Sequence, residues 1–440
     1  MRTFTFLWAG QLISALGTGL GQFALGVWVF RQTGSTTQFT MMAFVAASVA
    51  LALAPVAGTL ADRWDRRRIL ILSDVGSGAM TLTTAFLLFT DRLQAWHVYP
   101  IVAVMVGFSV FQGPALAATV GSLVPREHLA RASGMVQMSR AVAQILAPLA
   151  GGILIGRIGY QGLLLIDCVT FFLAVTTLLM LAIPRPPRPE DAGSRSLTGD
   201  FAAGWRYLRE RPGLFSLMSL YAVTNFSMSI VQVLLTPLVL SFATPVELGT
   251  VESAAAAGLL LGSLGLSIWG GPQKRVAGIF GLLLFQGCLL FLGGVEPSIP
   301  LIALVAFAFM CTLPIISGCS QAILQSKVDP GVQGRVFGMA GFIAASTVPL
   351  AAAVAGPLAD WVFEPALAPG GALAGSVGRL IGVGTGRGIG LLFILLGLFV
   401  VIVVPLAFLN PRLRRVESEL PDAVHPQAGA PEGEPRLQGA

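Results

Sequence analysis

Twelve apolar runs, each long enough to cross a bilayer, dominate this sequence of 440 residues. A single long polar interruption separates them into two sets of six. The first set covers about 4–30, 37–61, 69–90, 97–121, 133–156 and 161–183, and the second covers about 213–240, 249–270, 276–293, 298–323, 336–360 and 386–409. Because a helix needs about 20 apolar residues to cross the hydrocarbon core, the runs predict an all-α integral membrane protein with about twelve transmembrane helices.

Composition excludes a large soluble domain. Only 11% of the residues are charged and 55% are apolar, whereas soluble proteins average about 25% charged residues. The formal net charge is +6. Cytoplasmic loops of membrane proteins carry an excess of Lys and Arg, which explains this charge, so we expect no nucleic-acid partner. The four cysteines lie inside apolar runs, without the spacing of a disulfide framework or a zinc site.

The runs divide the chain into four parts. We expect an N-terminal six-helix half at 1–183, a cytoplasmic linker at 184–212, a C-terminal six-helix half at 213–410 and a disordered cytoplasmic tail at 411–440. With both termini in the cytoplasm, 22 of the 27 basic residues lie at or near the inner surface, as the positive-inside rule requires. The other five are Arg31, Arg92, Arg157, Arg379 and Arg387.

Two internal repeats relate the halves. The loop at 124–135 recurs 204 residues later at 328–339, with Val, Arg, Gly and Met at matching places. A second match relates residues 57–62 to residues 355–360, at run ends that face opposite sides of the membrane. Together the matches predict two halves that each contain two inverted three-helix repeats, an organisation typical of secondary transporters.

Missing motifs exclude several classes of function. The chain has no G-x-x-x-x-G-K-[ST] sequence, so ATP is not the energy source. Its three histidines, His97, His128 and His425, are scattered, which disfavours a metal site or a Ser-His-Asp arrangement. We expect neither an enzyme nor a resident cofactor or metal.

The turn between the second and third runs carries the most specific motif, which reads GTLADRWDRRR from Gly58 to Arg68. It resembles the G-x-L-a-D-r-x-g-r-[rk] signature of the major facilitator superfamily, with Asp65 in place of the second glycine. The likeness extends over nearly the whole chain through the helix count, the central linker and the two-fold repeat. The long, glycine-rich outer stretch from Trp361 to Gly390 is similar to the corresponding loop of the bacterial efflux branch, whose members export siderophores, macrolides and secondary metabolites.

The resemblance implies roles for the residues of this motif. Gly58 lets two helices approach closely, and Asp62 helps to lock the halves in the outward-facing state through the start of the run at 336–360. Asp65 tolerates the left-handed turn at the family's glycine better than most residues do. The basic residues either join the lock or only follow the positive-inside bias; those assigned to the gate are Arg63, Arg66 and Arg67.

Two antiporter patterns of the family are incomplete in this chain. Drug and proton antiporters often carry an arginine in the fourth helix, and residues 97–121 contain none. The glycine and proline pattern of the fifth helix is only partly matched at 147–152. Proton antiport is therefore an expectation from the family and not from a motif.

Uncharged polar side chains follow one face of the first run in each half. From the residues alone, they either line a cavity or join helices by hydrogen bonds. The resemblance favours the cavity, because the first, fourth, seventh and tenth helices line the path in this family. The two stripes supply Gln11, Ser14, Thr18, Gln22, Asn225, Ser229 and Gln232 to the expected lining. Gln112 of the fourth run and Ser317 and Gln321 of the tenth run join them. Since none of these side chains is charged, they predict a neutral or internally compensated substrate.

Ionisable residues within the runs are costly in a bilayer and are candidates for coupling. They are Asp74, Arg140, Asp167, Glu252 and Asp360. Asp74 and Arg140 have comparable depth, so an ion pair between them is one expectation. The other three lie near the outer ends of their runs, where an ordinary interfacial role is the alternative.

Together these features predict a monomeric secondary transporter of a bacterial inner membrane, surrounded by lipid. It exports an amphiphilic small molecule by alternating access, driven by the proton gradient. An importer or a lipid flippase on the same fold is the first alternative. A non-transporting membrane receptor or assembly protein is the second.

Overall fold

The computed structural model describes residues 2–181 and 205–414, apart from the side chains of residue 2 and residues 58–63. Every regular element within these ranges is helical. The first group of long helices comprises α1 (Arg2–Thr33), α2 (Thr36–Arg63), α3 (Arg66–Phe89), α4 (Ala95–Leu123) and α5 (Leu129–Met180). The second group comprises α7 (Pro212–Leu240), α8 (Pro245–Trp269), α9 (Arg275–Val295), α10 (Ile299–Lys327), α11 (Pro330–Pro357) and α14 (Arg387–Phe408).

Eleven of the described helical stretches are long and apolar enough to cross a membrane. The longest includes α5, which is broken at Gly159, where φ is 69° and ψ is −178°. Both segments of α5 pack on α1, since Ala147 lies against Gly19 and Thr170 lies against Gly17. The chain therefore folds back at Gly159 into two antiparallel segments. The predicted all-α membrane fold is confirmed.

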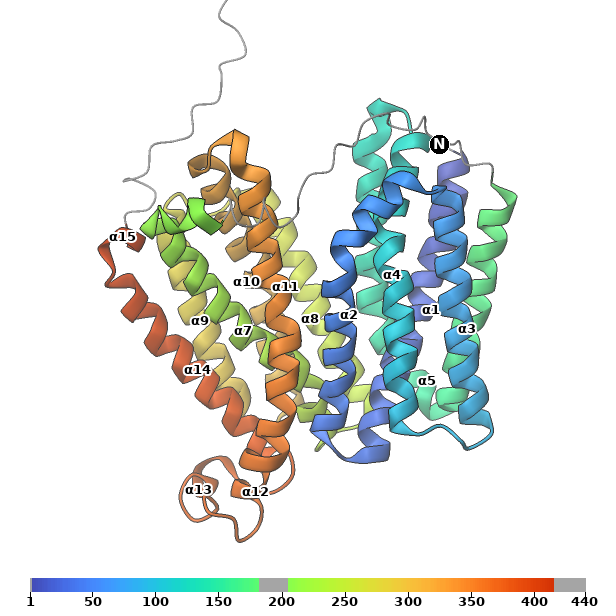
Figure 1. Ribbon diagram of the computed structural model, residues 1–440. Helices are drawn as coiled ribbons and strands as arrows, with labels where there is room; N and C mark the ends of the chain where they lie inside the picture. Colours follow the sequence, from blue (N-terminus) through green and yellow to red (C-terminus); the bar gives the residue numbers. More distant parts are fainter. Residues whose placement is uncertain (1, 182–204, 415–440) are drawn as a thin grey trace, which may run out of the picture.

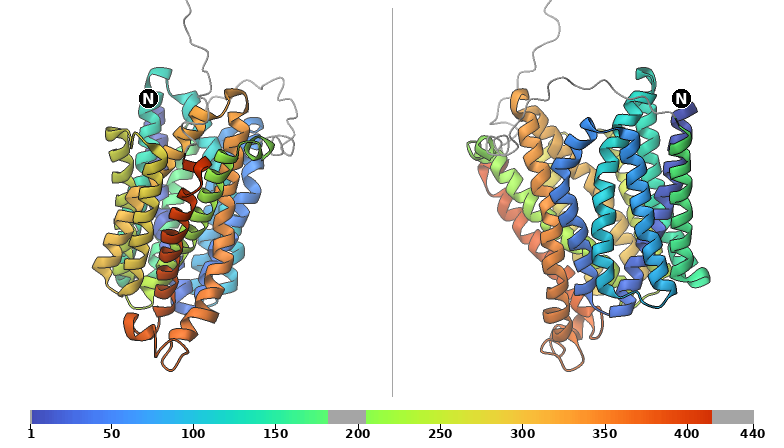
Figure 2. Two further views of the ribbon diagram at one scale, coloured as in Figure 1. Left: turned by 90° about the vertical axis from the view of Figure 1, so that its left-hand side faces the viewer. Right: turned by 45° about the vertical axis from the view of Figure 1, so that its right-hand side comes forward.

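The two groups of helices stand side by side (Figures 1 and 2). The start of α1 and the short helix α15 (Pro411–Arg414) lie at the same end of the bundle, which we call the termini end. The opposite, or loop, end carries the short π-helix η2 (Leu358–Phe363) and the helices α12 (Glu364–Leu367) and α13 (Gly378–Ile381). Most of the expected linker (184–204) and tail (415–440) lies outside the described residues.

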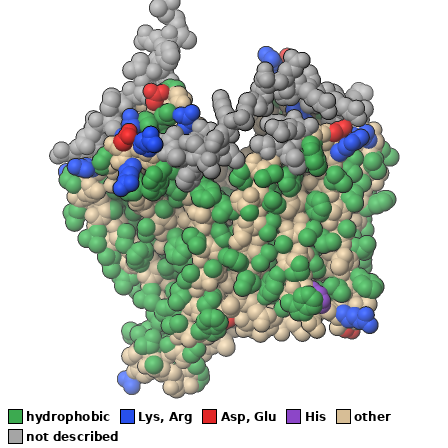
Figure 3. Space-filling view, viewed as in Figure 1, with side chains coloured by type: hydrophobic (Ala, Val, Ile, Leu, Met, Phe, Trp, Pro, Cys, Tyr) green, Lys and Arg blue, Asp and Glu red, His purple; other side chains and the backbone are tan. Residues whose placement is uncertain are grey.

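Apolar side chains cover the middle of the bundle on the face shown in Figure 3, and charged side chains gather at the two ends. Phe172, Leu304 and Ile268 are 72%, 63% and 88% exposed. A surface of this kind is stable only when lipid covers it. The chain is therefore a multi-pass membrane protein.

The two groups meet closely near the loop end. Any side chain on Gly152 of α5 would collide with the Pro245 carbonyl of α8, and any side chain on Gly249 of α8 would collide with the Pro148 carbonyl of α5. The Ser253 hydroxyl also donates a hydrogen bond to the Ile145 carbonyl at 2.6 Å. Backbones can approach this closely only where both helices carry small residues. In Figure 1 the two groups diverge from this contact toward the termini end.

Candidate functional site

A central cavity lies between the two groups and consists of two connected chambers. The first chamber, of about 680 Å³, is lined by residues of α1, α2, α4, α5, α7, α8 and α10. The second chamber, of about 740 Å³, lies nearer the termini end, between α5, α7, α8, α9 and α10. Arg140, Gln144, Ala256 and Leu259 line both chambers, so the two form one continuous space.

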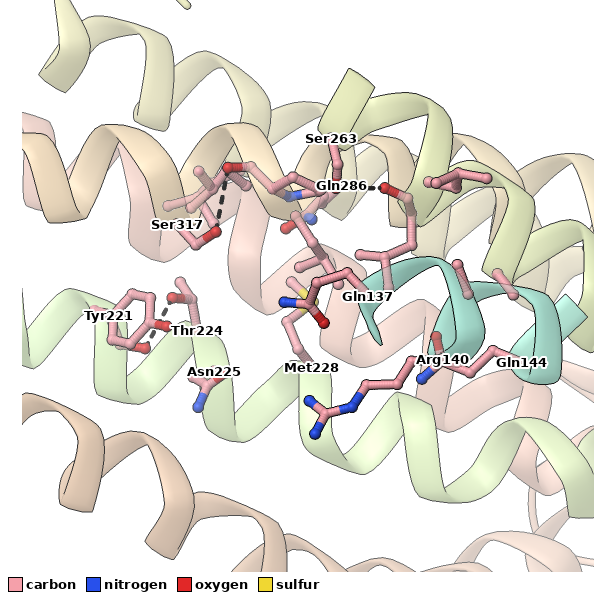
Figure 4. Close-up of a pocket in the computed structure, with 18 residues that line it drawn as sticks. Gln137, Arg140, Gln144, Tyr221, Thr224, Asn225, Met228, Ser263, Gln286 and Ser317 are labelled. Atoms are coloured by element: carbon pink, nitrogen blue, oxygen red, sulfur yellow. Dashed lines mark hydrogen bonds between the residues drawn. The ribbon is translucent and has the colours of Figure 1, made fainter. Parts of the chain in front are cut away.

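Most of the polar stripe residues face this cavity. The first chamber is lined by Gln11, Ser14, Thr18, Gln22, Gln112 and Gln232. The second chamber is lined by Asn225 and Ser317, which appear in Figure 4. These positions are compatible with a binding role. Helix pairing is also present, because the Asn225 amide donates to the Thr347 hydroxyl of α11 at 2.8 Å.

Two of the stripe residues lie away from the central cavity. Ser229 is only 5% exposed, donates to the Asn225 carbonyl at 2.8 Å and lines a small cavity inside the second group. Gln321 lines a separate cavity of about 320 Å³ beside α11. Ser229 matched the register of the stripe on α7, and Gln321 was expected in the lining because it lies on the tenth run. Each helix turns these positions toward a neighbour within its own group.

Asp74 of α3 holds two of the cavity glutamines in place. Its carboxylate accepts hydrogen bonds from the Gln112 amide at 2.7 Å and from the Gln11 amide at 3.2 Å, and the residue is 1% exposed. The expected ion pair with Arg140 is wrong, because among the described residues the only ion pair within 4.0 Å joins Glu127 and His128. Two amide donors take the place of the arginine.

The cavity is lined by one acidic and one basic side chain. Glu252 of α8 lines the first chamber and accepts a hydrogen bond from the Thr236 hydroxyl at 2.9 Å. Arg140 of α5 lines both chambers and points into the second one in Figure 4. Its guanidinium forms no ion pair within 4.0 Å with any residue that the structure describes. The expected lining without fixed charge is therefore wrong. The stripe on α1 and α7 is uncharged, but α5 and α8 complete the wall with one base and one acid.

Glu252 and Arg140 lie at different depths. Ser253 is hydrogen-bonded to Ile145, which places Glu252 level with the α5 residues near Leu146. Arg140 lies six residues closer to the termini end, or about 9 Å along the helix at 1.5 Å per residue. The acid therefore lies nearer the contact between α5 and α8 at the loop end, and the base lies nearer the termini end.

The rest of the first chamber is largely apolar and aromatic. Its wall includes Phe23, Phe39, Met42, Phe171 and Met310. Aromatic rings and flexible methionines adapt to bulky apolar ligands, whereas amides fix polar groups. The chamber therefore combines a large apolar surface with a few fixed polar groups.

Asp360 joins the two groups at the loop end. Its carboxylate accepts hydrogen bonds from the Ser35 hydroxyl at 2.7 Å and from the backbone N–H groups of Thr37 at 2.8 Å and Thr36 at 3.1 Å. These donors form the start of α2, whereas Asp360 belongs to η2 of the other group. A carboxylate at a helix N-terminus satisfies free N–H groups and favours the helix dipole.

The signature motif is described only in part. Gly58, Asp62 and Arg63 form the last turns of α2, and their side chains lie outside the described part of the chain. Asp65 has φ −63° and ψ 111° and caps α3 by accepting from Arg67 N. The left-handed backbone expected at Asp65 is therefore wrong, because a β-region cap replaces the glycine turn.

Arg66 and Arg67, the two gate arginines whose side chains are described, donate hydrogen bonds to backbone carbonyls within the first group of helices. Arg66 donates to the Ala118 carbonyl of α4 at 3.0 Å. Arg67 donates to the carbonyls of Leu178 and Leu179, at the end of α5, at 3.1 and 2.7 Å. Leu178 and Leu179 lie in the last turn of α5, where carbonyls have no helical partner and where a cation is favoured by the helix dipole. In this conformation both arginines tie helices of the first group together.

A comparison of the sequence with known protein families identifies the family of this chain. The Major Facilitator Superfamily model matches residues 7–353. The chain belongs to the major facilitator superfamily. That family consists of transporters, so the chain is a membrane transporter and not an enzyme, and the predicted family is confirmed.

The chain is similar to bacterial efflux proteins of this superfamily. It is 27% identical to macrolide efflux protein A of Streptococcus pyogenes over 361 residues, which cover 81% of this chain and 89% of that protein. It is 25% identical to the multidrug efflux pump Tap of Mycolicibacterium fortuitum over 362 residues, covering 79% and 87% of the two chains.

Solved structures share the fold at low sequence identity. A bacterial homologue of the human lysosomal transporter Spinster, in an inward-facing and unoccupied conformation, aligns with a TM-score of 0.70 and 15% identity, over 94% of this chain and 97% of that one. The nucleoside transporter NupG aligns with a TM-score of 0.72 and 13% identity, over 93% and 99% of the two chains.

Three glutamines of the cavity were not predicted. Gln137 and Gln144 flank Arg140 on α5 by three and four residues, so all three share one helix face. Gln286 of α9 is fully buried and donates to the Thr312 hydroxyl at 2.6 Å. A polar residue in an apolar run is a usable signal for such positions, but the prediction applied it only to the first, fourth, seventh and tenth runs, whereas these glutamines lie on α5 and α9.

Proposed function

We propose that this transporter exports an amphiphilic organic cation, by alternating access and in exchange for protons. The observation that carries this proposal is the central cavity, which is closed near the loop end and lined by aromatic rings, amides and one carboxylate. The similarity to macrolide and multidrug efflux proteins supports export over import.

The orientation of the chain supports an inward-facing conformation. Of the 27 basic residues, 22 fall at the termini end in the proposed topology, and basic residues are retained in the cytoplasm. The cavity then opens to the cytoplasm and is sealed on the outer side, where α5 meets α8 and where Asp360 caps α2. A substrate enters from the cytoplasm and leaves after the seal has moved to the other end.

Glu252 determines the charge of the substrate that fits best. An organic ammonium placed in the first chamber exchanges its hydration for a carboxylate and for the faces of aromatic rings, and both favour a cation. Arg140 disfavours such a cation nearer the cytoplasmic mouth, which directs the cation toward Glu252. Gln11 and Gln112, held by Asp74, supply donors and acceptors for the polar groups of the same molecule.

Two aspartates act as latches at opposite ends in this proposal. Asp360 stabilises the closed outer end through the start of α2. Asp62 occupies the matching place of the inverted repeat, and the family motif implies that it stabilises the outward-facing state through the start of α11. Each latch is made in only one state, so each biases the equilibrium between them.

A ligand panel tests the proposal. We expect purified protein to bind ethidium, an amphiphilic cation, at least tenfold more tightly than it binds Nile red, a neutral dye of similar bulk, as measured by fluorescence titration in detergent. Preference for phospholipid over both dyes would favour the flippase alternative. Binding of no dye, together with unchanged drug and siderophore sensitivity of a deletion strain, would favour a receptor or assembly protein.

A further inference from the structure

A buried carboxyl lies in the first group of helices, apart from the central cavity. Asp167, on the second segment of α5, is 1% exposed. One of its oxygens, Oδ2, accepts a hydrogen bond from the Thr81 hydroxyl of α3 at 3.1 Å. The other, Oδ1, is buried and has no hydrogen-bond partner within 3.5 Å among the described residues. The Thr18 side chain of α1, which lines the central cavity, also lies near this carboxyl.

This carboxyl faces a cavity of about 230 Å³ enclosed by α1, α2, α3, α4 and α5. Thr81, Thr84 and Gln22 supply the other polar side chains of the lining, and the remaining residues are aliphatic, methionine or glycine. The neighbouring titratable residue is Cys168 on the same helix. None of the five helices presents another charged or titratable side chain to this cavity.

The surroundings determine what this site can hold. A buried carboxylate without a cation or a full set of donors costs several kcal/mol. A hard metal cation takes about six oxygen ligands, and the lining offers side-chain oxygens from only four residues, one of them a glutamine. A proton neutralises the charge and needs only one oxygen, which Oδ1 provides.

The site communicates with the substrate cavity through α1. Gln22 lines both spaces. A side chain on Gly21 would come within 2.7 Å of Asp167 Oδ2, so the α1 backbone lies directly against the carboxyl. A shift of α1 against α5 therefore changes access to the carboxyl and the wall of the substrate cavity together.

We propose that Asp167 is a proton-binding site of this transporter, separate from the substrate cavity and protonated in the inward-facing conformation. The proton forms an O–H bond at Oδ1, and when it leaves past Gln22 the carboxylate regains its charge. Its role in driving export rests on the function proposed above, whereas the protonation of the site does not.

Infrared spectroscopy of the purified full chain tests the protonation directly. At neutral pH we expect a protonated carboxyl C=O band that shifts in D₂O and that is lost in Asp167→Asn. The band should persist in Asp91→Asn, a control at an exposed loop acid. Thr81→Val keeps the carboxyl and removes a hydrogen bond, so it should move the band without abolishing it. If Asp167→Asn does not fold, the Thr81→Val variant alone tests the assignment of the band. A spectrum unchanged in both variants would overturn the proposal.

Transport separates the coupling role from the protonation. In proteoliposomes, Asp167→Asn should lower the ratio of uphill to downhill ethidium export at least tenfold under an imposed pH gradient. A band that disappears while this ratio stays at the parent value would refute the coupling role. A parent protein that binds and moves no dye would refute the proposed function, while the infrared result would still decide whether Asp167 binds a proton.

Discussion

Replacing Asp360 by asparagine should open the outer end of the transporter. The carboxylate accepts three hydrogen bonds from the start of α2, and hydrogen bonds to a charged group contribute about 1.5–3 kcal/mol each. Asparagine keeps one acceptor but turns an NH₂ group toward N–H donors. We expect the outward-facing population to rise about tenfold to a hundredfold, since 1.4 kcal/mol corresponds to a factor of ten.

Spin labels at Arg92 and Arg379, one in an outer loop of each group, measure this shift by pulsed electron resonance in a cysteine-free background. Glu296→Gln removes an exposed acid at the same end and should leave the distance distribution unchanged. Asp62→Asn should move the equilibrium in the opposite direction if the two latches are mirror images. An Asp360→Asn distribution that matches the parent would show that the α5 and α8 contact alone holds the outer end closed.

Replacing Glu252 by glutamine should weaken ethidium binding about tenfold to a hundredfold, because it removes a charge-assisted contact of about 1.5–3 kcal/mol. The change keeps the shape of the side chain, so the chamber should keep its volume and its apolar wall. Fluorescence titration of purified protein measures the effect. Nile red is neutral and gains little from the Glu252 carboxylate, so its affinity should change by less than threefold.

Thr236→Val is the matched control for this prediction. It removes the hydroxyl that donates to Glu252 at 2.9 Å but leaves the carboxylate in the chamber. We expect ethidium affinity to change much less than in Glu252→Gln. Equal losses for ethidium and Nile red in Glu252→Gln would mean that the substitution had altered the cavity, and the electrostatic account of specificity would be wrong.

The pattern of apolar runs predicted the helices well, because each run must satisfy all of its backbone groups within one helix in a bilayer. The turn at Gly159 also lay between two predicted runs. The family was predictable from the motif at Gly58 to Arg68. Its glycine, its acids and its arginines fall together in one short turn between two apolar runs, and few other proteins combine them in this way. These signals are local in the sequence.

The charge of the cavity was not predictable by the same method. Arg140 and Glu252 were recognised as unusual, but their helix faces depend on how α5 and α8 pack across the interface between the groups. The same limit applies to Asp360, whose partners at 35–37 are more than 320 residues away in the chain. Inverted repeats identify matching positions, but the contacts at those positions follow from the conformation.

Uphill export in proteoliposomes tests the central claim most directly. Purified transporter is reconstituted with ethidium on both sides of the membrane, and a pH gradient is imposed, acidic on the side that corresponds to the cell exterior. The account predicts that ethidium accumulates on the acidic side above its starting concentration, and that collapsing the gradient with a protonophore abolishes the accumulation. Accumulation that is equal with and without the gradient, or ethidium movement that only equalises the two sides, would contradict a proton-driven exporter.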